Sequence, residues 1–256
     1  MKRVLVTGSN GQLGQCLHKI APLYKGFKFI FKNSADLDIT DRLSIKKNFD
    51  SNDFDYCINC AAYTYVEQAE KTPDIAYKVN AEGVKNLAHV CKDYSTTLIH
   101  ISTDYVFDGE KDGPYTVKDV PNPINEYGKS KLQGEKYIQD IMENYCIIRT
   151  SWLYSEFGKN FYTTILKKAR AGENLSVTDI QIGCPTNANN LAKYIVGKLA
   201  RNNNFGIEHF TDGYSCTWFD FAKKILIDQG LQMTVKLRRD KNYRTFVKRP
   251  VNSVLN

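Results

Sequence analysis

The sequence predicts an α/β protein in which a parallel sheet is covered by helices on both faces and is followed by a smaller C-terminal lobe. Two observations lead to this fold class. Short apolar runs recur along residues 1–152, and the segments between them repeat their apolar residues at helical spacing. Strands that are almost continuously apolar are typical of a doubly wound parallel sheet, because such a sheet is buried on both faces.

Five strands are expected in the first part of the chain. They are predicted at residues 3–8, 27–31, 56–62, 96–102 and 145–152. Each run is rich in β-branched and aromatic residues, which suit a buried pleated strand. Two of the intervening helices are especially clear. The helix after the first strand carries on one face Leu13, Cys16, Leu17 and Ile20. The helix before the fourth strand carries on one face Val79, Gly83, Leu87, Val90 and Cys91.

After residue 152 the alternation of strand and helix becomes looser. Helices are expected near 161–171 and 189–200, with a strand at 175–179 between them. We therefore divide the chain into a first domain over 1–152, which also includes the helix near 189–200, and a smaller lobe formed by most of 153–256.

Composition excludes several classes of protein. Of the 256 residues, 42% are hydrophobic and 25% charged, and no apolar run approaches the roughly 18 to 20 residues that span a membrane. The N-terminus lacks the features of a signal peptide, so we expect a cytoplasmic protein without a membrane partner. The net charge of +7 comes from scattered residues and accompanies no nucleic-acid-binding fingerprint, so no nucleic-acid partner is expected.

The cysteines do not predict a metal or disulfide framework. Seven are spread over the whole chain, and an odd number in this pattern indicates reduced thiols. Cys57 and Cys60 form a CxxC motif, but they lie in a predicted strand, where residues three apart point to opposite faces. Because no second pair and no histidine lies close by in the sequence, we expect no metal site.

Three glycines at the end of the first strand indicate a dinucleotide site. Gly8, Gly11 and Gly14 recur every third residue between a good strand and a good helix. Glycine suits the tight turn, the close approach of backbone N–H groups to a diphosphate, and the packing of the helix on its strand. The helix N-terminus then faces the negative charge of the diphosphate. The alternative is a simple strand-to-helix turn, but the context favours a dinucleotide-binding Rossmann domain.

The end of the second strand bears on the type of cofactor. An acid at this position binds the ribose hydroxyls of NAD, whereas this chain has Lys32. A lysine there can pair with a 2′-phosphate, so NADPH is the expected cofactor. A single exposed lysine is more often only solvated, and Asp36 and Asp38 follow closely, so NADH stays an alternative.

A tyrosine and a lysine four residues apart suggest acid-base chemistry. Three such pairs occur, namely Tyr24 with Lys28, Tyr127 with Lys131, and Tyr194 with Lys198. Only the pair of Tyr127 and Lys131 follows a strand that ends in a polar cluster, Ser102, Thr103 and Asp104, at the edge where open α/β sheets bind ligands. This position distinguishes the pair from the other two.

The residue types match the reduction of a ketone. Hydride transfer leaves negative charge on the substrate oxygen, and a positioned acid supplies the proton. Residues four apart share one helical face, so Lys131 can lower the pKa of Tyr127 and reach the nicotinamide ribose. Thr103 can donate a hydrogen bond to the same oxygen. The alternative is that Lys131 forms a surface ion pair with Glu135 and Tyr127 merely begins the helix.

The chain resembles the dTDP-4-dehydrorhamnose reductases, a branch of the extended short-chain dehydrogenase/reductases. Seven motifs carry the resemblance over nearly the whole chain, namely TGxxGQLG, NCAAYTYVEQAE, ISTDYVFDG, NEYGKSKLQGE, IIRTSWLY, IQIGCPT and RPVNSVL. The resemblance implies reduction of the 4-keto group of dTDP-6-deoxy-L-lyxo-4-hexulose to dTDP-L-rhamnose. Another nucleotide-linked 4-keto-6-deoxy sugar, or a non-catalytic regulatory subunit with the same fold, stays an alternative.

The resemblance also implies roles for individual residues. Thr103, Tyr127 and Lys131 would be catalytic, with Tyr127 the proton donor. The cofactor would be lined by Gly11, Gln12, Leu13, Asp38, Ile39, Ala61, Ala62 and Tyr63. Thr103, Asp104 and Trp152 would contact the nucleotide-sugar substrate, although Trp152 can also be read as core packing. The C-terminal lobe would mostly bind substrate, no magnesium site is carried over, and a homodimer is compatible with the resemblance.

Overall fold

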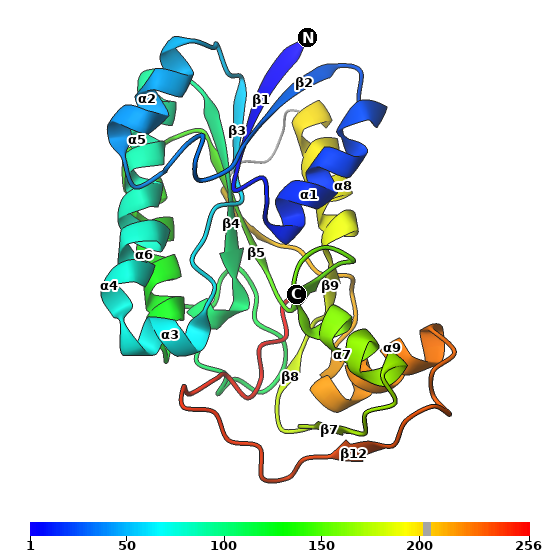
Figure 1. Cartoon of the computed structure of the whole chain (residues 1–256). Coiled ribbons are helices and arrows are strands. Elements are labelled where there is room, and N and C mark those ends of the chain that lie inside the picture. Colours follow the sequence, from blue (N-terminus) through cyan, green and yellow to red (C-terminus); the bar gives the residue numbers. More distant parts are fainter. Residues whose placement is uncertain (202–205) are drawn as a thin grey trace.

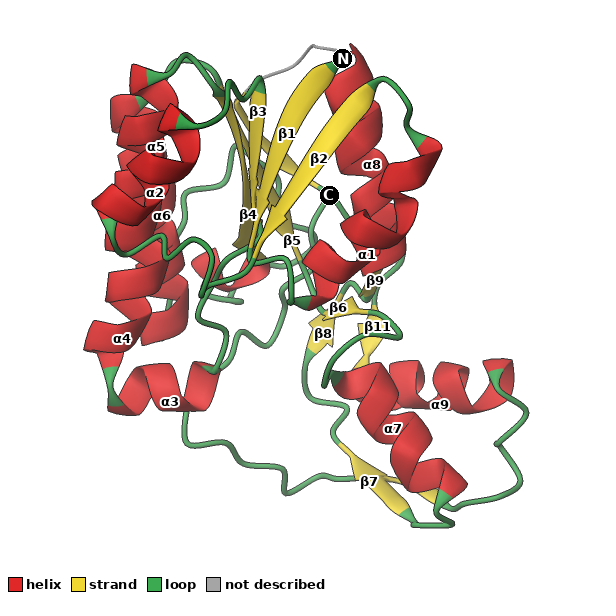
Figure 2. Cartoon of the chain, turned by 45° about the horizontal axis from the view of Figure 1, so that its top comes forward, coloured by secondary structure: helices red, strands yellow, loops and turns green. Residues whose placement is uncertain are grey.

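The chain forms a large sheet covered by helices and a smaller lobe at one end of it (Figures 1 and 2). The structure is a computed structural model, and it describes residues 1–201 and 206–256. The large sheet contains β1 (Lys2–Thr7), β2 (Phe27–Lys32), β3 (Tyr56–Asn59), β4 (Thr97–Thr103), β5 (Tyr145–Thr150) and β10 (Gly206–His209).

All neighbouring strands of this sheet are parallel, in the order β10-β5-β4-β3-β1-β2. The direction of winding reverses between β1 and β3, and ligands of such sheets bind at the carboxyl ends of the strands on either side of that point. The five predicted strands are present, although β3 and β5 end two to three residues earlier than expected. The sixth strand, β10, was not predicted.

Helices cover both faces of the sheet, which confirms the predicted doubly wound architecture (Figure 2). One face packs on α1 (Gln12–Ile20) and α8 (Ala188–Arg201). The other packs on α2 (Arg42–Asp50), α5 (Val84–Asp93) and α6 (Glu126–Ile141). Strand β1 shows why a continuous apolar run is needed, because Val4 and Val6 enter the first core while Leu5 enters the second.

The connection between β3 and β4 is helical for most of its length. It contains α3 (Val66–Lys71), α4 (Pro73–Tyr77), the π-helical turn η2 (Lys78–Gly83) and then α5. Helix α6 packs tightly on η2, since a Cβ added at Gly134 would lie 2.2 Å from the carbonyl oxygen of Asn80. Two short 3₁₀ helices, η1 (Ala21–Leu23) and η3 (Asp104–Val106), follow α1 and β4.

The smaller lobe has its own core. It contains α7 (Phe161–Arg170), β7 (Leu175–Val177), α9 (Trp218–Asp228) and β12 (Leu237–Arg239). Its core is formed by Ile165, Leu166, Ala169, Leu175, Val177, Phe221, Ala222, Ile225 and Leu226. Two short strand pairs join the lobe to the large sheet: β6 (Leu153–Tyr154) with β9 (Thr186–Asn187), and β8 (Ile182–Gly183) with β11 (Cys216–Thr217).

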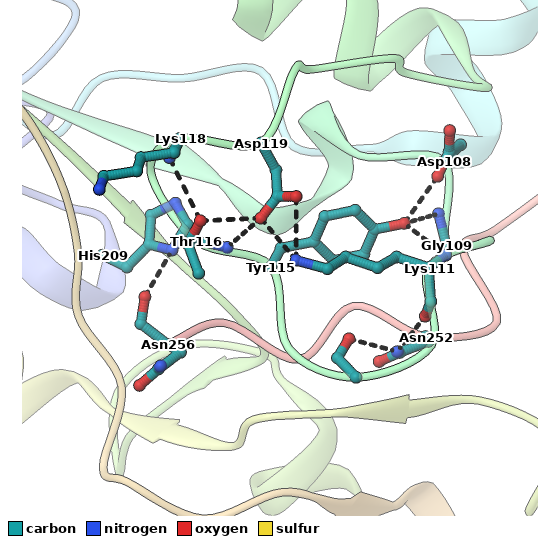
Figure 3. A network of polar contacts seen from close by, with 11 residues as sticks. Asp108, Gly109, Lys111, Tyr115, Thr116, Lys118, Asp119, His209, Asn252 and Asn256 are labelled. Carbon is teal, nitrogen blue, oxygen red and sulfur yellow. Dashed lines mark hydrogen bonds and ion pairs between the residues drawn. The ribbon is translucent and has the colours of Figure 1, made fainter.

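The C-terminal segment returns from the lobe to the loop that follows β4 (Figure 3). The N–H of Tyr115 donates to the carbonyl of Val254 at 2.7 Å, and the N–H of Asn256 donates to the carbonyl of Tyr115 at 2.8 Å. The side-chain amide of Asn252 donates to the carbonyl of Lys111 at 2.8 Å. These bonds hold the end of the chain against the loop after β4, and Arg249, shortly before them, lines the cleft described below.

Two further expectations from the sequence concern membrane-spanning helices and metal sites. Within residues 1–201 and 206–256, no helix is long and apolar enough to cross a membrane. In the same residues, no three His, Cys, Asp or Glu side chains are grouped to hold a metal ion. Cys57 and Cys60 are free thiols on opposite faces of the sheet, as the strand spacing predicts.

Candidate active site

Two adjoining cavities lie at the carboxyl ends of the strands. The first has a volume of about 360 Å³ and the second a volume of about 540 Å³. The residues that line both are Asn10, Gly11, Cys60 and Ala62. Because these walls are shared, the two cavities form one cleft that runs from the glycine turn to the small lobe.

The glycine turn is built so that only glycine fits at two of its positions. Gly8 has a φ of +63°, and a Cβ there would lie 2.6 Å from the backbone nitrogen of Ala61. A Cβ at Gly14 would lie 2.6 Å from the carbonyl oxygen of Ser9. Gly11 precedes the first residue of α1 and offers no capping side chain. Backbone and helix N-terminus are therefore free to approach a diphosphate, as the spacing predicts.

Most of the predicted cofactor residues lie in the cleft. The first cavity is lined by Gly8, Gly11, Asp38, Ile39, Ala61, Ala62 and Tyr63, and the second adds Gln12 and Leu13. Gly14 lies behind the turn and packs α1 against it. Lys32 lines neither cavity; its carbonyl accepts the N–H of Ser9 at 3.1 Å, and Asn33 and Ser34 form the wall at the end of β2.

The three predicted catalytic residues line the second cavity together. Thr103 is the last residue of β4, and Tyr127 and Lys131 lie on the first two turns of α6. The start of α6 is defined by Asn125, whose side-chain oxygen accepts the N–H of Gly128 at 2.8 Å. Since the N-cap fixes the first turn, it also fixes the position of Tyr127.

Lys131 is buried and does not form the surface ion pair that was the alternative. Its amine donates to the carbonyl of Ile101 at 2.7 Å and lies 3.3 Å from Nε2 of His100. Glu135 instead pairs with Arg149 at 2.6 Å, and both of these side chains are buried. Burial lowers the pKa of Lys131 from 10.5 to about 8.

The pKa of Tyr127 differs from the sequence-based expectation. Burial raises it above its ordinary value, a hydrogen bond with Thr103 acts in the opposite direction, and the charge of Asp104 raises it further. The expected lowering by Lys131 is not found, because that amine is directed to the carbonyl of Ile101. Tyr127 therefore keeps its proton at neutral pH, which suits a proton donor.

Asp104 holds Thr103 in place from inside the protein. The Thr103 hydroxyl donates to Oδ1 of Asp104 at 3.0 Å, and the hydroxyl of Ser151 donates to Oδ2 at 3.0 Å. Burial raises the pKa of Asp104 to about 6, although hydrogen bonds from Ser253, Ser151 and Thr103 oppose this effect. With its oxygens engaged, Asp104 is placed to orient Thr103.

Trp152 combines backbone strain with an aromatic stack. Its φ is +45°, a conformation that non-glycine residues rarely adopt. Its indole lies flat on that of Trp218, with ring centroids 3.5 Å apart and planes 5° apart. A Cβ at Gly183 would lie 2.4 Å from the Trp152 ring. Both indoles line the second cavity, so one face of Trp152 is covered by Trp218 and the stack as a whole forms the wall.

Several residues of the site carry no role in the sequence analysis. Arg249 and Lys159 bring positive charge to the second cavity, and Arg249 pairs with Glu67 at 2.9 Å. Asn80 is buried in the π-helical turn, and its side chain holds the backbone N–H and carbonyl of Tyr63 at 2.8 and 2.9 Å. The available signal for Asn80 was a polar residue in an otherwise apolar helical pattern, whereas the RPVNSVL motif contained Arg249 without indicating what it faces.

Comparison with known proteins relates the whole chain to one family. The model of the family described as RmlD substrate binding domain matches residues 1–256. A dTDP-4-dehydrorhamnose reductase of Aggregatibacter actinomycetemcomitans is 37% identical over 269 residues, which cover 100% of this chain and 90% of that relative. A dTDP-4-keto-6-deoxy-D-glucose reductase of Streptomyces niveus is 40% identical over 224 residues, which cover 86% of this chain and 76% of that relative.

A solved structure shows the same similarity in three dimensions. It is the dTDP-4-dehydrorhamnose reductase of Bacillus anthracis str. Ames in complex with NADP. The two structures superpose with a TM-score of 0.95 at 36% sequence identity, and the match covers 100% of this chain and 91% of that one.

Proposed function

The chain belongs to the family described as RmlD substrate binding domain, and we propose that it is the NADPH-dependent reductase that converts dTDP-6-deoxy-L-lyxo-4-hexulose to dTDP-L-rhamnose. One observation carries the proposal. Thr103, Tyr127 and Lys131 line a cavity that is continuous with a glycine turn suited to a dinucleotide. A hydride donor and a proton donor can therefore meet at one substrate carbonyl.

The glycine turn leaves space for a dinucleotide, and a larger residue at Gly8 would not fit there. Alanine at Gly8 would collide with Ala61, so the close approach of backbone at the turn is retained. Asn33 and Ser34 supply hydrogen-bond donors at the end of β2, next to Lys32. NADPH supplies the hydride when bound. NADH stays the alternative, and the preference for NADPH is supported by the NADP bound to the structurally similar Bacillus anthracis protein.

Tyr127 is the proton donor in this proposal. Its pKa is raised, so the hydroxyl is protonated at neutral pH and can deliver its proton as negative charge develops on the substrate oxygen. The single hydroxyl proton of Thr103, which points to Asp104 in this structure, would turn to that oxygen as negative charge develops on it and form a second hydrogen bond. With a pKa of about 8, Lys131 is largely protonated near neutrality, and its ammonium would stabilise the phenolate on turning from the carbonyl of Ile101.

The opposite wall of the second cavity suits a nucleotide sugar. The stacked indoles of Trp152 and Trp218 give this wall an apolar, aromatic lining against which the sugar can pack. Lys159 and Arg249 place two cations in the same cavity, and a nucleoside diphosphate sugar carries two negative charges. Both walls are needed for productive binding.

A second candidate is the reduction of another nucleotide-linked 4-keto-6-deoxy sugar. The Streptomyces niveus relative, which acts on dTDP-4-keto-6-deoxy-D-glucose by its name, favours this candidate. A non-catalytic regulatory role is disfavoured, since Thr103, Tyr127 and Lys131 all line the cavity.

Turnover with identified products tests the proposal. Purified protein is mixed with dTDP-6-deoxy-L-lyxo-4-hexulose and either NADPH or NADH, oxidation of the cofactor is followed, and the product is identified by NMR. dTDP-L-rhamnose is the expected product. No oxidation with either cofactor rejects the first candidate. A product of the other C4 configuration, or oxidation only with dTDP-4-keto-6-deoxy-D-glucose, supports the second. The homodimer stays a prediction that light scattering tests, and the cytoplasmic location stays a prediction from sequence.

A further inference from the structure

Three buried polar side chains form a row across the large sheet. Thr7, Asn59 and His100 are register partners on β1, β3 and β4, so their side chains point to the same face. They are at most 1% exposed. The preceding row on this face is apolar and consists of Leu5, Cys57 and Leu98. Polar groups buried in such a face are costly unless they are hydrogen-bonded, which makes their partners informative.

The hydrogen bonds of Asn59 determine the orientation of its amide. The backbone N–H of Ala61 can only donate, and it lies 3.1 Å from Oδ1 of Asn59. The Thr7 hydroxyl bonds to the same oxygen at 2.6 Å. The amide nitrogen of Asn59 therefore faces Nδ1 of His100, at 3.1 Å. Because that nitrogen can only donate, Nδ1 must accept, and His100 is a neutral imidazole with its proton on Nε2.

The proton on Nε2 of His100 points to the catalytic lysine. Nε2 lies 3.3 Å from the amine of Lys131, which also donates to the carbonyl of Ile101. An N–H facing an ammonium group is unfavourable, whereas the lone pair of a neutral amine can accept it. Other titratable groups that act on Lys131 are Glu135, which is ion-paired with Arg149, and Cys60, whose thiol has a raised pKa because it is buried.

We propose that Asn59 and His100 are positioning residues, which hold Lys131 in the cleft wall and make its ammonium form less favourable than it would be without the Nε2–H of His100. In the resting site this N–H weakens proton binding by the amine but leaves it largely protonated at neutral pH. Once Tyr127 has given its proton to the substrate oxygen, the phenolate attracts the ammonium that is already present, and no proton moves to Lys131, so the attraction is strongest when it assists the reaction. Burial lowers the pKa values of both His100 and Lys131, in agreement with this geometry. The catalytic consequence rests on the proposed function, whereas the state of His100 does not.

The tautomer can be measured without turnover. The chain has four histidines, so ¹⁵N NMR of the side chains, compared with a His100→Gln variant, identifies the signals of His100. We expect a protonated Nε2, an unprotonated Nδ1 and no titration between about pH 6 and 8. A protonated Nδ1, or titration near the ordinary histidine pKa, would overturn the proposal even if the protein reduces no sugar.

A double-mutant cycle tests the effect on Lys131. In Asn59→Asp the new carboxylate can still accept the N–H of Ala61, but it requires a proton on Nδ1, so Nε2 becomes an acceptor for the ammonium. In the full-length enzyme with NADPH and keto sugar, we expect the basic limb of the kcat pH profile to move upward by at least about one pH unit. The same substitution in a His100→Leu background should move it much less. If Asn59→Asp moves the basic limb equally in the wild-type and His100→Leu backgrounds, the new carboxylate acts directly on Lys131 and the proposal is refuted. The proposal is also refuted if the basic limb moves in neither background. If the variants fail to fold or lack activity, the NMR measurement on the unaltered protein still decides.

Discussion

The two walls of the cleft are held by different kinds of interaction. On the side of the large sheet, Thr103, Asp104, His100 and Lys131 are buried and linked to the protein by hydrogen bonds. On the side of the small lobe, the wall is the stack of Trp152 and Trp218, which packs on Phe161 and Phe221. Directional bonds hold reacting groups in register, whereas stacked rings mainly provide surface. Under the proposed function, this difference would place the chemistry on the sheet and substrate recognition on the lobe.

The largest effect is expected from removing the proton donor on the sheet side. Tyr127→Phe should lower kcat by about 10²–10⁴-fold, because general acid catalysis contributes that much. NADPH affinity, measured by fluorescence titration, should stay within about twofold, since the ring is retained. Unchanged turnover would remove Tyr127 from the mechanism and with it the division of labour between the two walls.

The glycine turn provides the next largest effect. Gly8→Ala places a methyl group 2.6 Å from the backbone of Ala61 at a φ of +63°. We expect NADPH to bind at least about tenfold more weakly, since strain of this kind costs of order 1–3 kcal/mol. Gly172→Ala is the matched control, because Gly172 has a φ of +73° with nothing within 4 Å of an added Cβ. Equal NADPH affinities in the two variants would contradict the close approach at the turn.

The buried amine of Lys131 makes the stability of the protein depend on pH. Its pKa is lowered from 10.5 to about 8, so between these pH values the unfolded chain holds a proton that the folded protein does not. Wild-type stability should therefore rise with pH through this window. Lys131→Met should be more stable than wild type by about 1–2 kcal/mol at pH 7, after the lost hydrogen bond to Ile101 is subtracted, with the difference shrinking toward pH 10. Denaturant unfolding across this range checks it, and a difference that does not vary with pH argues against a buried cation.

The smallest effect is expected on the lobe side. Gly183→Ala would press on the indole of Trp152 and tilt the aromatic wall. We expect KM for the keto sugar to rise about three- to tenfold, about 1 kcal/mol, with NADPH affinity unchanged. Gly197→Ala on α8 is the control, because an added Cβ there meets nothing within 4 Å. A loss of kcat with an unchanged KM would show that the lobe takes part in the chemistry.

Local patterns in the sequence were sufficient for much of the fold and the site. The strands β1 to β5 lie where their apolar runs place them, and the glycine turn and the pair of Tyr127 and Lys131 meet at the same cleft. The strand β10 was missed because its four residues, Gly206–His209, are too short and too mixed to stand out. The ion pair of Glu135 with Arg149 was missed for another reason, since it joins α6 to β5 across the fold.

The pKa values of Tyr127 and Lys131 could not be predicted from the sequence. The four-residue spacing put Lys131 near Tyr127, and this is correct, but spacing carries no information on which partner the amine selects. The carbonyl of Ile101 and the ring of His100 reach it from β4, thirty or more positions earlier in the chain. Burial then lowers one pKa and raises the other, an effect that depends on everything packed around the two groups.

The sequence by itself determined the doubly wound fold, the glycine turn and the proposed catalytic trio, because each depends on local patterns at the ends of strands and the starts of helices. Tertiary structure alone decided that Ser151 bonds to Asp104, that Asn59 orients His100 toward Lys131, and that Trp218 covers one face of Trp152. These contacts join different strands, helices and lobes. They arise only when the parallel strands are in register and the small lobe is packed against the end of the sheet.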